Sequence, residues 1–199
     1  LQIFDQSGFV IVGIAYSMFK VIDAYYHVYY SGKSINFLTY INYILFLPVI
    51  TSGPMHRYRD FKKSIDNPIE IDILVFSESI KRIIRGLFKK LVLVNLLMIV
   101  FNHLQTLEIS WNISLAIILM SYLILYFDLS GYSDIAIAFG SLYGILVPEN
   151  FKKPWSAPTM TQFWRNWHVT LSDYIREHIY VVVVKKKLNK YQGGFIGFS

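Results

Sequence analysis

The sequence predicts an all-α, polytopic membrane protein, and three observations support this fold class. Of the 199 residues, 54% are hydrophobic and 16% are charged, whereas about 25% charged residues are usual in soluble domains. The mean hydropathy is +0.42, and several apolar runs approach the roughly 20 residues that a helix needs to cross a bilayer. Basic residues gather beside these runs, as expected of cytoplasmic anchors, at residues 57–63, 81–90 and 185–190. We therefore expect four or five helical membrane segments, some of them short or re-entrant.

The composition also limits the chemistry and the organisation of the chain. Cysteine is absent, which excludes disulfides, thiolate metal sites and a cysteine nucleophile. The spacing of histidines and carboxylates predicts no metal site. The chain begins at Leu1 without a signal-peptide pattern, and apolar residues return at 193–199. We expect residues 1–199 to form a single membrane-embedded domain and to be an internal piece of a longer chain.

The first apolar run, residues 9–30, predicts a helix with two different faces. Lys20, Asp23 and His27 follow one another at spacings of three and four, which places them on one side of a helix. We expect that side to face protein or water and the other side to face lipid, with Lys20 and Asp23 neutralising each other.

The next two runs predict a short span and an amphipathic helix. Residues 35–51 are about the minimum length for a span, with a kink at Pro48. His56, in the basic loop that follows, is predicted to be structural. Residues 77–90 carry apolar and basic residues at helical spacing, which indicates a basic amphipathic helix lying in the membrane interface. This helix continues into the apolar residues 91–101.

A polar octapeptide, Phe127–Asp134, separates the clearest span, residues 110–127, from a shorter apolar segment, residues 135–147. A carboxylate at membrane depth costs roughly 2.5–3.5 kcal/mol on insertion scales, so such residues normally face protein or a watery cavity. One interpretation is that the octapeptide lines a polar path. The alternative is a loop at the membrane surface, in which Asp128 and Asp134 cap helix ends.

A capping box at residues 159–162 predicts a helix that continues to Tyr180. Helical spacing would place His168 between the indole rings of Trp164 and Trp167. Desolvation there would keep the imidazole neutral, which is the state that a general base requires. The alternative is an aromatic interfacial helix whose histidine is merely hydrogen-bonded.

Four stretches share a pattern with one known family. They are Ser52–Phe61, Gly86–Lys90, Phe127–Asp134 with Pro148–Phe151, and Phe163–Ser172 with Arg176. In this order and spacing, within a hydrophobic chain, they resemble the membrane-bound O-acyltransferase family. The likeness is greatest to the bacterial branch that contains the alginate O-acetylation membrane protein and the teichoic-acid D-alanine transfer protein.

This resemblance implies a multi-pass enzyme of the bacterial plasma membrane. Such an enzyme moves an acyl group, here expected to be acetyl, from a cytoplasmic thioester toward a hydroxyl of an exported cell-surface polysaccharide. The donor would be acetyl-coenzyme A or an acyl-carrier thioester, with no tightly bound cofactor. An extracytoplasmic acyltransferase could be a partner, and no nucleic acid is involved. The alternatives are D-alanyl transfer from a carrier protein to teichoic acid and a non-catalytic channel or scaffold.

The resemblance also implies roles for individual residues. His168 matches the histidine of the family's Trp-x-x-Trp-His motif and is the candidate catalytic residue. The family carries a second histidine downstream, beyond Ser199. Glu177 and His178 stand where an Asp-Tyr pair is expected, and His178 is predicted to be solvated. The other candidates are pocket or channel residues Asp128, Ser130, Tyr132, Asp134, Trp164, Arg165 and Trp167, and loop-motif residues Arg57 and Tyr58.

Overall fold

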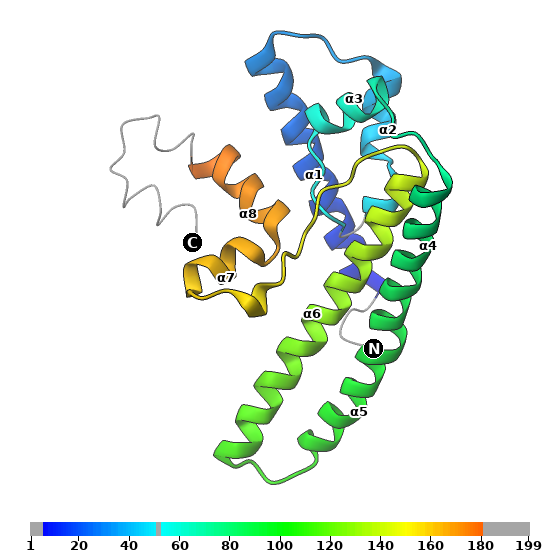
Figure 1. The fold of residues 1–199 in the computed structure, drawn as a ribbon. Helices are drawn as coiled ribbons and strands as arrows, with labels where there is room; N and C mark the ends of the chain where they lie inside the picture. The colour runs from blue at the N-terminus through cyan, green and yellow to red at the C-terminus, as the bar shows by residue number, and fades with distance from the viewer. Residues whose placement is uncertain (1–5, 51–52, 181–199) are drawn as a thin grey trace. The chain divides into compact units, whose positions relative to one another are not determined.

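The computed structural model describes residues 6–50 and 53–180. In these ranges every regular element is a helix and no strand occurs, so the predicted all-α fold is confirmed. The chain forms two compact units, residues 1–68 with 146–199 and residues 69–145, whose helices are labelled in Figure 1. The prediction of a single membrane-embedded domain stays a prediction. The basic cluster at 185–190 and the apolar residues at 193–199 lie outside the described residues.

The first unit begins with helix α1 (Gln6–Ser31), whose polar face is as predicted. Lys20 is 4% exposed, and its ammonium group donates to the carbonyl oxygens of Tyr43 and Ile44 at 3.2 and 3.3 Å. The Asp23 carboxylate accepts hydrogen bonds from the Tyr58 N–H at 2.6 Å and the Tyr43 hydroxyl at 3.2 Å. The predicted Lys20–Asp23 pair is wrong, because each side chain binds its own partners on neighbouring segments.

The second apolar run does not form a continuous span, so that prediction is wrong. Helix α2 (Phe37–Ile44) has only 8 residues, which is about 12 Å, whereas the hydrocarbon core is about 30 Å thick. A 3-10 turn, η1 (Leu47–Val49), follows with Pro48 in its first turn. Proline has no N–H to donate, and inside an α-helix its ring would clash with the carbonyl four residues earlier. For Pro48 that carbonyl belongs to Ile44, the last residue of α2.

The remaining helices of the first unit are short. They are α3 (Tyr58–Asp66), η3 (Pro154–Ser156), α7 (Met160–Asn166), α8 (Val169–Ile175) and the π-helical turn η4 (Arg176–Tyr180). The predicted start of α7 is confirmed, since the Thr159 hydroxyl accepts the N–H of Gln162 at 3.2 Å.

The predicted continuous helix from residue 159 to Tyr180 is wrong, because the chain leaves helical geometry between α7 and α8. His168 has φ +46° and ψ +52°, a left-handed conformation. The backbone on either side pairs with another segment: Lys152 N–H donates to the Asn166 carbonyl at 3.0 Å, and Val169 N–H donates to the Asn150 carbonyl at 2.9 Å. These bonds replace the helical ones at the break.

The second unit is a long helical hairpin. Helix α4 (Ile73–Leu87) runs through a π-helical turn, η2 (Phe88–Leu93), into α5 (Val94–Gln105). Both helices pack against α6 (Trp111–Leu142), as Figure 1 shows. Among the described residues, α6 is the one helix long and apolar enough to cross a membrane. The helix predicted over residues 77–90 is confirmed as part of α4 and η2, and it packs along α6; its position in the membrane interface stays a prediction.

The octapeptide Phe127–Asp134 is helical, so the interpretation of it as a loop is wrong. It lies inside α6, a helix of 32 residues that includes residues 135–142. Neither Asp128 nor Asp134 caps a helix end. The helix tolerates the polar residues because they find partners: the Ser133 hydroxyl, for example, donates to the Leu129 carbonyl one turn earlier at 2.8 Å.

Two glycines set the close approach of α4 and α6. A Cβ on Gly86 would lie 2.7 Å from the Gly131 carbonyl oxygen and 3.2 Å from the backbone nitrogen of Ile135. A Cβ on Gly131 would lie 2.9 Å from the Gly86 carbonyl oxygen. Since the nearby atoms are mostly backbone, they cannot move aside as a flexible side chain could.

We predict that Gly86→Ala destabilises the complete protein. Overpacking of this kind typically costs about 1–3 kcal/mol, which should lower the thermal unfolding midpoint in detergent by several degrees. Leu87→Ala is the matched control, because Leu87 is the next residue and is 42% exposed. A Gly86→Ala protein that melts with the wild type would show that the two helices do not meet at these glycines.

Candidate functional site

His168 lies in an aromatic wall at the break between α7 and α8. Its ring centroid is 6.1 Å from that of Phe151. The Trp167 ring stacks on Phe163 at 5.8 Å and meets Phe151 edge-on at 5.2 Å. The expectation that His168 sits between two indoles is only half right: Trp167 belongs to this wall, whereas Trp164 is 57% exposed.

The electrostatics of His168 suit a group that accepts a proton. Burial lowers its pKa below the ordinary value of 6.5, because the charged imidazolium loses solvation. Its Nδ1 is fully enclosed and has no hydrogen-bond partner among the described residues. Left-handed backbone at a non-glycine residue costs roughly 1–2 kcal/mol. Such a conformation persists only where its surroundings hold it, and it occurs often at functional sites.

The loop-motif residues Arg57 and Tyr58 have structural partners in the same unit. The Arg57 guanidinium pairs with the Glu177 carboxylate at 2.9 Å. Tyr58 is buried at the start of α3, and its N–H donates to Asp23. Arg165 is exposed on α7. The structure therefore places these residues around the site but gives none of them a contact with His168.

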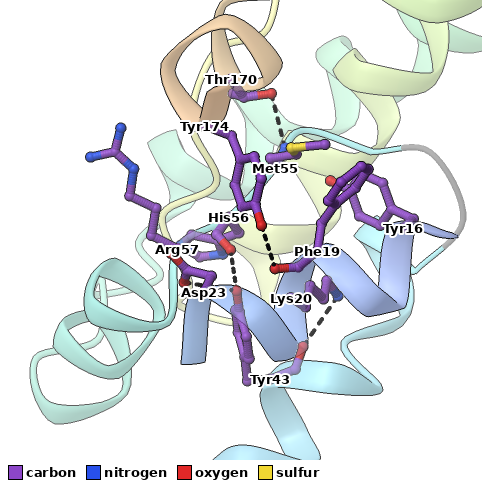
Figure 2. Close-up of a pocket in the computed structure, with 10 residues that line it drawn as sticks. All are labelled: Tyr16, Phe19, Lys20, Asp23, Tyr43, Met55, His56, Arg57, Thr170 and Tyr174. Atoms are coloured by element: carbon purple, nitrogen blue, oxygen red, sulfur yellow. Dashed lines mark hydrogen bonds between the residues drawn. The ribbon is translucent and has the colours of Figure 1, made fainter. Parts of the chain in front are cut away.

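A small polar cavity lies beneath α8, as Figure 2 shows. Its free volume is about 10 Å³, which is roughly the space for one water molecule. Lys20 and Asp23 reach it from α1, His56 from the loop before α3, and Thr170 and Tyr174 from α8. The Tyr174 hydroxyl donates to the Phe19 carbonyl at 3.2 Å.

His178 is not solvated, so that prediction is wrong. Its side chain is 8% exposed, and its Nε2 lies 3.2 Å from the Asp23 carboxylate. Its ring stacks on that of Tyr174 with centroids 4.1 Å apart. The π-helical turn η4 carries the ring inward, onto the polar face of α1. Sequence spacing could not reveal this contact, because Asp23 and His178 belong to opposite ends of the chain.

His56 is buried, with 3% of its surface exposed. Neither ring nitrogen has a hydrogen-bond partner among the described residues. Burial lowers its pKa from the ordinary 6.5 to about 4, so the ring is neutral near pH 7.

We predict that this burial makes the stability of the complete protein pH-dependent. The unfolded chain takes up the His56 proton near pH 6.5, whereas the folded chain does so only near pH 4. Stability is therefore full above pH 6.5 and falls as the pH drops, by on the order of 2 kcal/mol between pH 7.5 and pH 5. His56→Phe should reduce this loss by about that amount in melting experiments. His103→Gln, at an exposed position on α5, should leave it unchanged. A His56→Phe protein with the wild-type pH profile would contradict the burial of His56.

The second unit contains a separate ionic cluster at the octapeptide. The Asp134 carboxylate, 8% exposed, binds Arg82 at 2.9 Å, Arg85 at 3.2 Å and Lys89 at 2.7 Å. Lys90 pairs with Asp128. The basic residues of α4 and η2 thus pair with the two carboxylates of α6. The sequence analysis describes both groups but does not predict that they pair.

The four octapeptide candidates belong to the second unit, whereas His168 belongs to the first. Ser130 is buried, and its hydroxyl oxygen has no partner among the described residues. Tyr132 is half-buried. The two carboxylates are accounted for by ion pairs, so a role for Asp128, Ser130, Tyr132 and Asp134 in a polar path stays a prediction.

We predict that Asp134→Asn destabilises the complete protein much more than Asp128→Asn. Removing one member of a fully buried ion pair costs about 3–5 kcal/mol. Because Arg82, Arg85 and Lys89 are 20–58% exposed, we expect on the order of 2 kcal/mol. Asp128 and Lys90 are about 40% exposed, and exposed pairs contribute about 0–1 kcal/mol. Equal thermal midpoints for the two variants would contradict this ranking.

The described residues form helices only, and one of these helices, α6, is long and apolar enough to cross a membrane. The ionic cluster between α4 and α6 and the partly buried His168 at the start of α8 give this helical protein two polar sites. The chain belongs to the membrane-bound O-acyltransferase family, whose model matches residues 17–199. The resemblance given by the sequence motifs is confirmed.

Three relatives illustrate the range of the family. The chain is 32% identical over 179 residues to a probable alginate O-acetylase AlgI of Pseudomonas syringae, covering 86% of this chain and 34% of the relative. It is 33% identical over 159 residues to a peptidoglycan O-acetyltransferase of Helicobacter pylori, covering 73% and 28%. It is 30% identical over 164 residues to a teichoic acid D-alanyltransferase of Streptococcus thermophilus, covering 76% and 39%. The chain thus spans about a third of the length of these relatives.

Proposed function

We propose that the complete protein is an O-acyltransferase of the bacterial plasma membrane, with several membrane passes. It transfers an acetyl group from a cytoplasmic thioester toward a hydroxyl of an exported cell-surface polysaccharide. The observation that carries this proposal is the position of His168, a neutral and largely buried imidazole on a strained turn. Family membership supports the reaction class.

The reaction needs a base and a site for negative charge. The acceptor hydroxyl oxygen attacks the thioester carbonyl carbon while the base takes the hydroxyl proton. The tetrahedral oxyanion then collapses, the carbon–sulfur bond breaks, and the sulfur leaves with a proton as the free thiol. A neutral imidazole can accept the first proton and return it to the sulfur. We assign this step to His168, with Trp167 as its wall and Trp164 and Arg165 lining the approach.

We infer the acyl donor and the partner protein from the similarity of this chain to its relatives. We propose acetyl-coenzyme A or an acyl-carrier thioester as the donor, without a tightly bound cofactor, and an extracytoplasmic acyltransferase as a partner. The alginate and peptidoglycan relatives, which are named as an O-acetylase and an O-acetyltransferase, favour acetyl transfer. D-alanyl transfer to teichoic acid is the second candidate, because the Streptococcus relative is nearly as similar.

We predict that His168→Ala in the complete protein lowers acyl transfer by about 100-fold or more, as expected for loss of a general base. Membrane insertion should be unchanged. The assay follows both the acylated polymer and the released thiol. His103→Ala, at an exposed position on α5, should retain full activity. Normal transfer by His168→Ala would remove the proposed role of His168, and an inactive wild type would favour a channel or scaffold.

A further inference from the structure

We infer that Asn150 and Thr170 are positioning residues for His168, and this inference rests on the function proposed above. Both side chains are buried, with 1% and 6% of their surface exposed. Neither was a candidate in the sequence analysis. Asn150 lies 18 residues before His168, which would be about 27 Å along a continuous helix, so local spacing does not bring the two residues together.

The first turn of α8 is not capped by the side chain of its N-cap residue. His168 occupies the N-cap position, where a side-chain oxygen normally accepts an N–H from the first turn. The capping side chains of α2, α4, α6 and α7 do so: they are Asn36, Asp72, Ser110 and Thr159. The His168 side chain makes no such bond.

Asn150 supplies this cap from a different segment of the chain. Its carbonyl oxygen accepts the Val169 N–H at 2.9 Å. Its side-chain oxygen, Oδ1, accepts the Thr170 N–H at 3.4 Å. Two of the N–H groups that a helix start leaves unpaired are therefore satisfied by one residue outside the helix.

Thr170 anchors this arrangement to a third segment. Its hydroxyl donates to Asn150 Oδ1 at 2.9 Å and accepts the Met55 N–H at 2.9 Å. Figure 2 shows Thr170 above Met55, at the edge of the polar cavity. The hydroxyl is thus used in both directions, and a buried network with its groups satisfied is rigid.

These bonds fix the backbone conformation of His168 and leave its imidazole ring able to accept a proton. The hydrogen bonds of Asn150 and Thr170 described above go to backbone N–H groups and to each other, and His168 Nδ1 has no partner among the described residues. The two residues fix the left-handed backbone, and through it the place of the imidazole, without occupying a ring nitrogen. They do not need to touch substrate.

The test compares Thr170→Val with Thr170→Ser in the complete protein. Valine keeps the shape but loses both hydrogen bonds, whereas serine keeps them. We expect Thr170→Val to lower kcat by about 10- to 100-fold, since small misplacements of a reacting group have effects of this size. The KM for the donor should change by less than about threefold, and the acidic limb of the pH–rate profile should shift. Thr170→Ser should stay within about threefold of wild type.

Two outcomes would overturn the inference. One is a Thr170→Val enzyme with wild-type kcat and pH profile, and the other is equal loss in the serine and valine variants. If Thr170→Val does not accumulate in the membrane, Thr170→Cys is judged by the same two criteria, because a thiol is only a weak donor and acceptor. His168→Ala separates the two proposals: if it keeps full activity the proposed function fails, and if it is inactive while Thr170→Val is normal only the inference fails.

Discussion

The cap that Asn150 places on α8 is the constraint on which the first unit depends. A histidine in left-handed backbone is unfavourable by itself, and the side chain of His168, at the N-cap position of α8, does not cap that helix. Asn150 closes that helix from outside, and Thr170 ties the cap to Met55. Three segments, widely separated in sequence, are thereby fixed around one imidazole. The same packing buries His56 and brings His178 onto Asp23.

The second unit is stabilised by a different balance of forces. Gly86 and Gly131 let two helix backbones approach closely, and the ionic cluster at Asp134 forms beside that contact. A carboxylate in an apolar helix would be costly alone, and basic side chains on α4 reduce that cost. Residues that first suggest a channel therefore also have a structural role, in a helix that stays unbroken from Trp111 to Leu142.

Composition and periodicity were sufficient to predict the helical class, the polar face of α1 and the start of α7, because these depend on local spacing. They failed wherever residues distant in sequence determine the local backbone conformation. The continuous helix through His168 looked correct locally, but Asn150 and Lys152 take the backbone groups at the break. The loop interpretation of the octapeptide is wrong because Asp134 binds Arg82, Arg85 and Lys89 from a distant segment, which the sequence pattern alone does not show. His168 was predicted through its motif, whereas Asn150 could not be connected to it without coordinates.

The most direct test of the central claim is a structure of the complete protein with an unreactive thioester donor analogue bound. The account predicts that His168 keeps its left-handed turn, capped by Asn150. It also predicts that an imidazole nitrogen lies near the thioester carbonyl, where an attacking hydroxyl would be within about 2.6–3.2 Å of the ring or one water away. A donor bound with its thioester remote from His168, or a His168 that has become an ordinary helical residue, would contradict it.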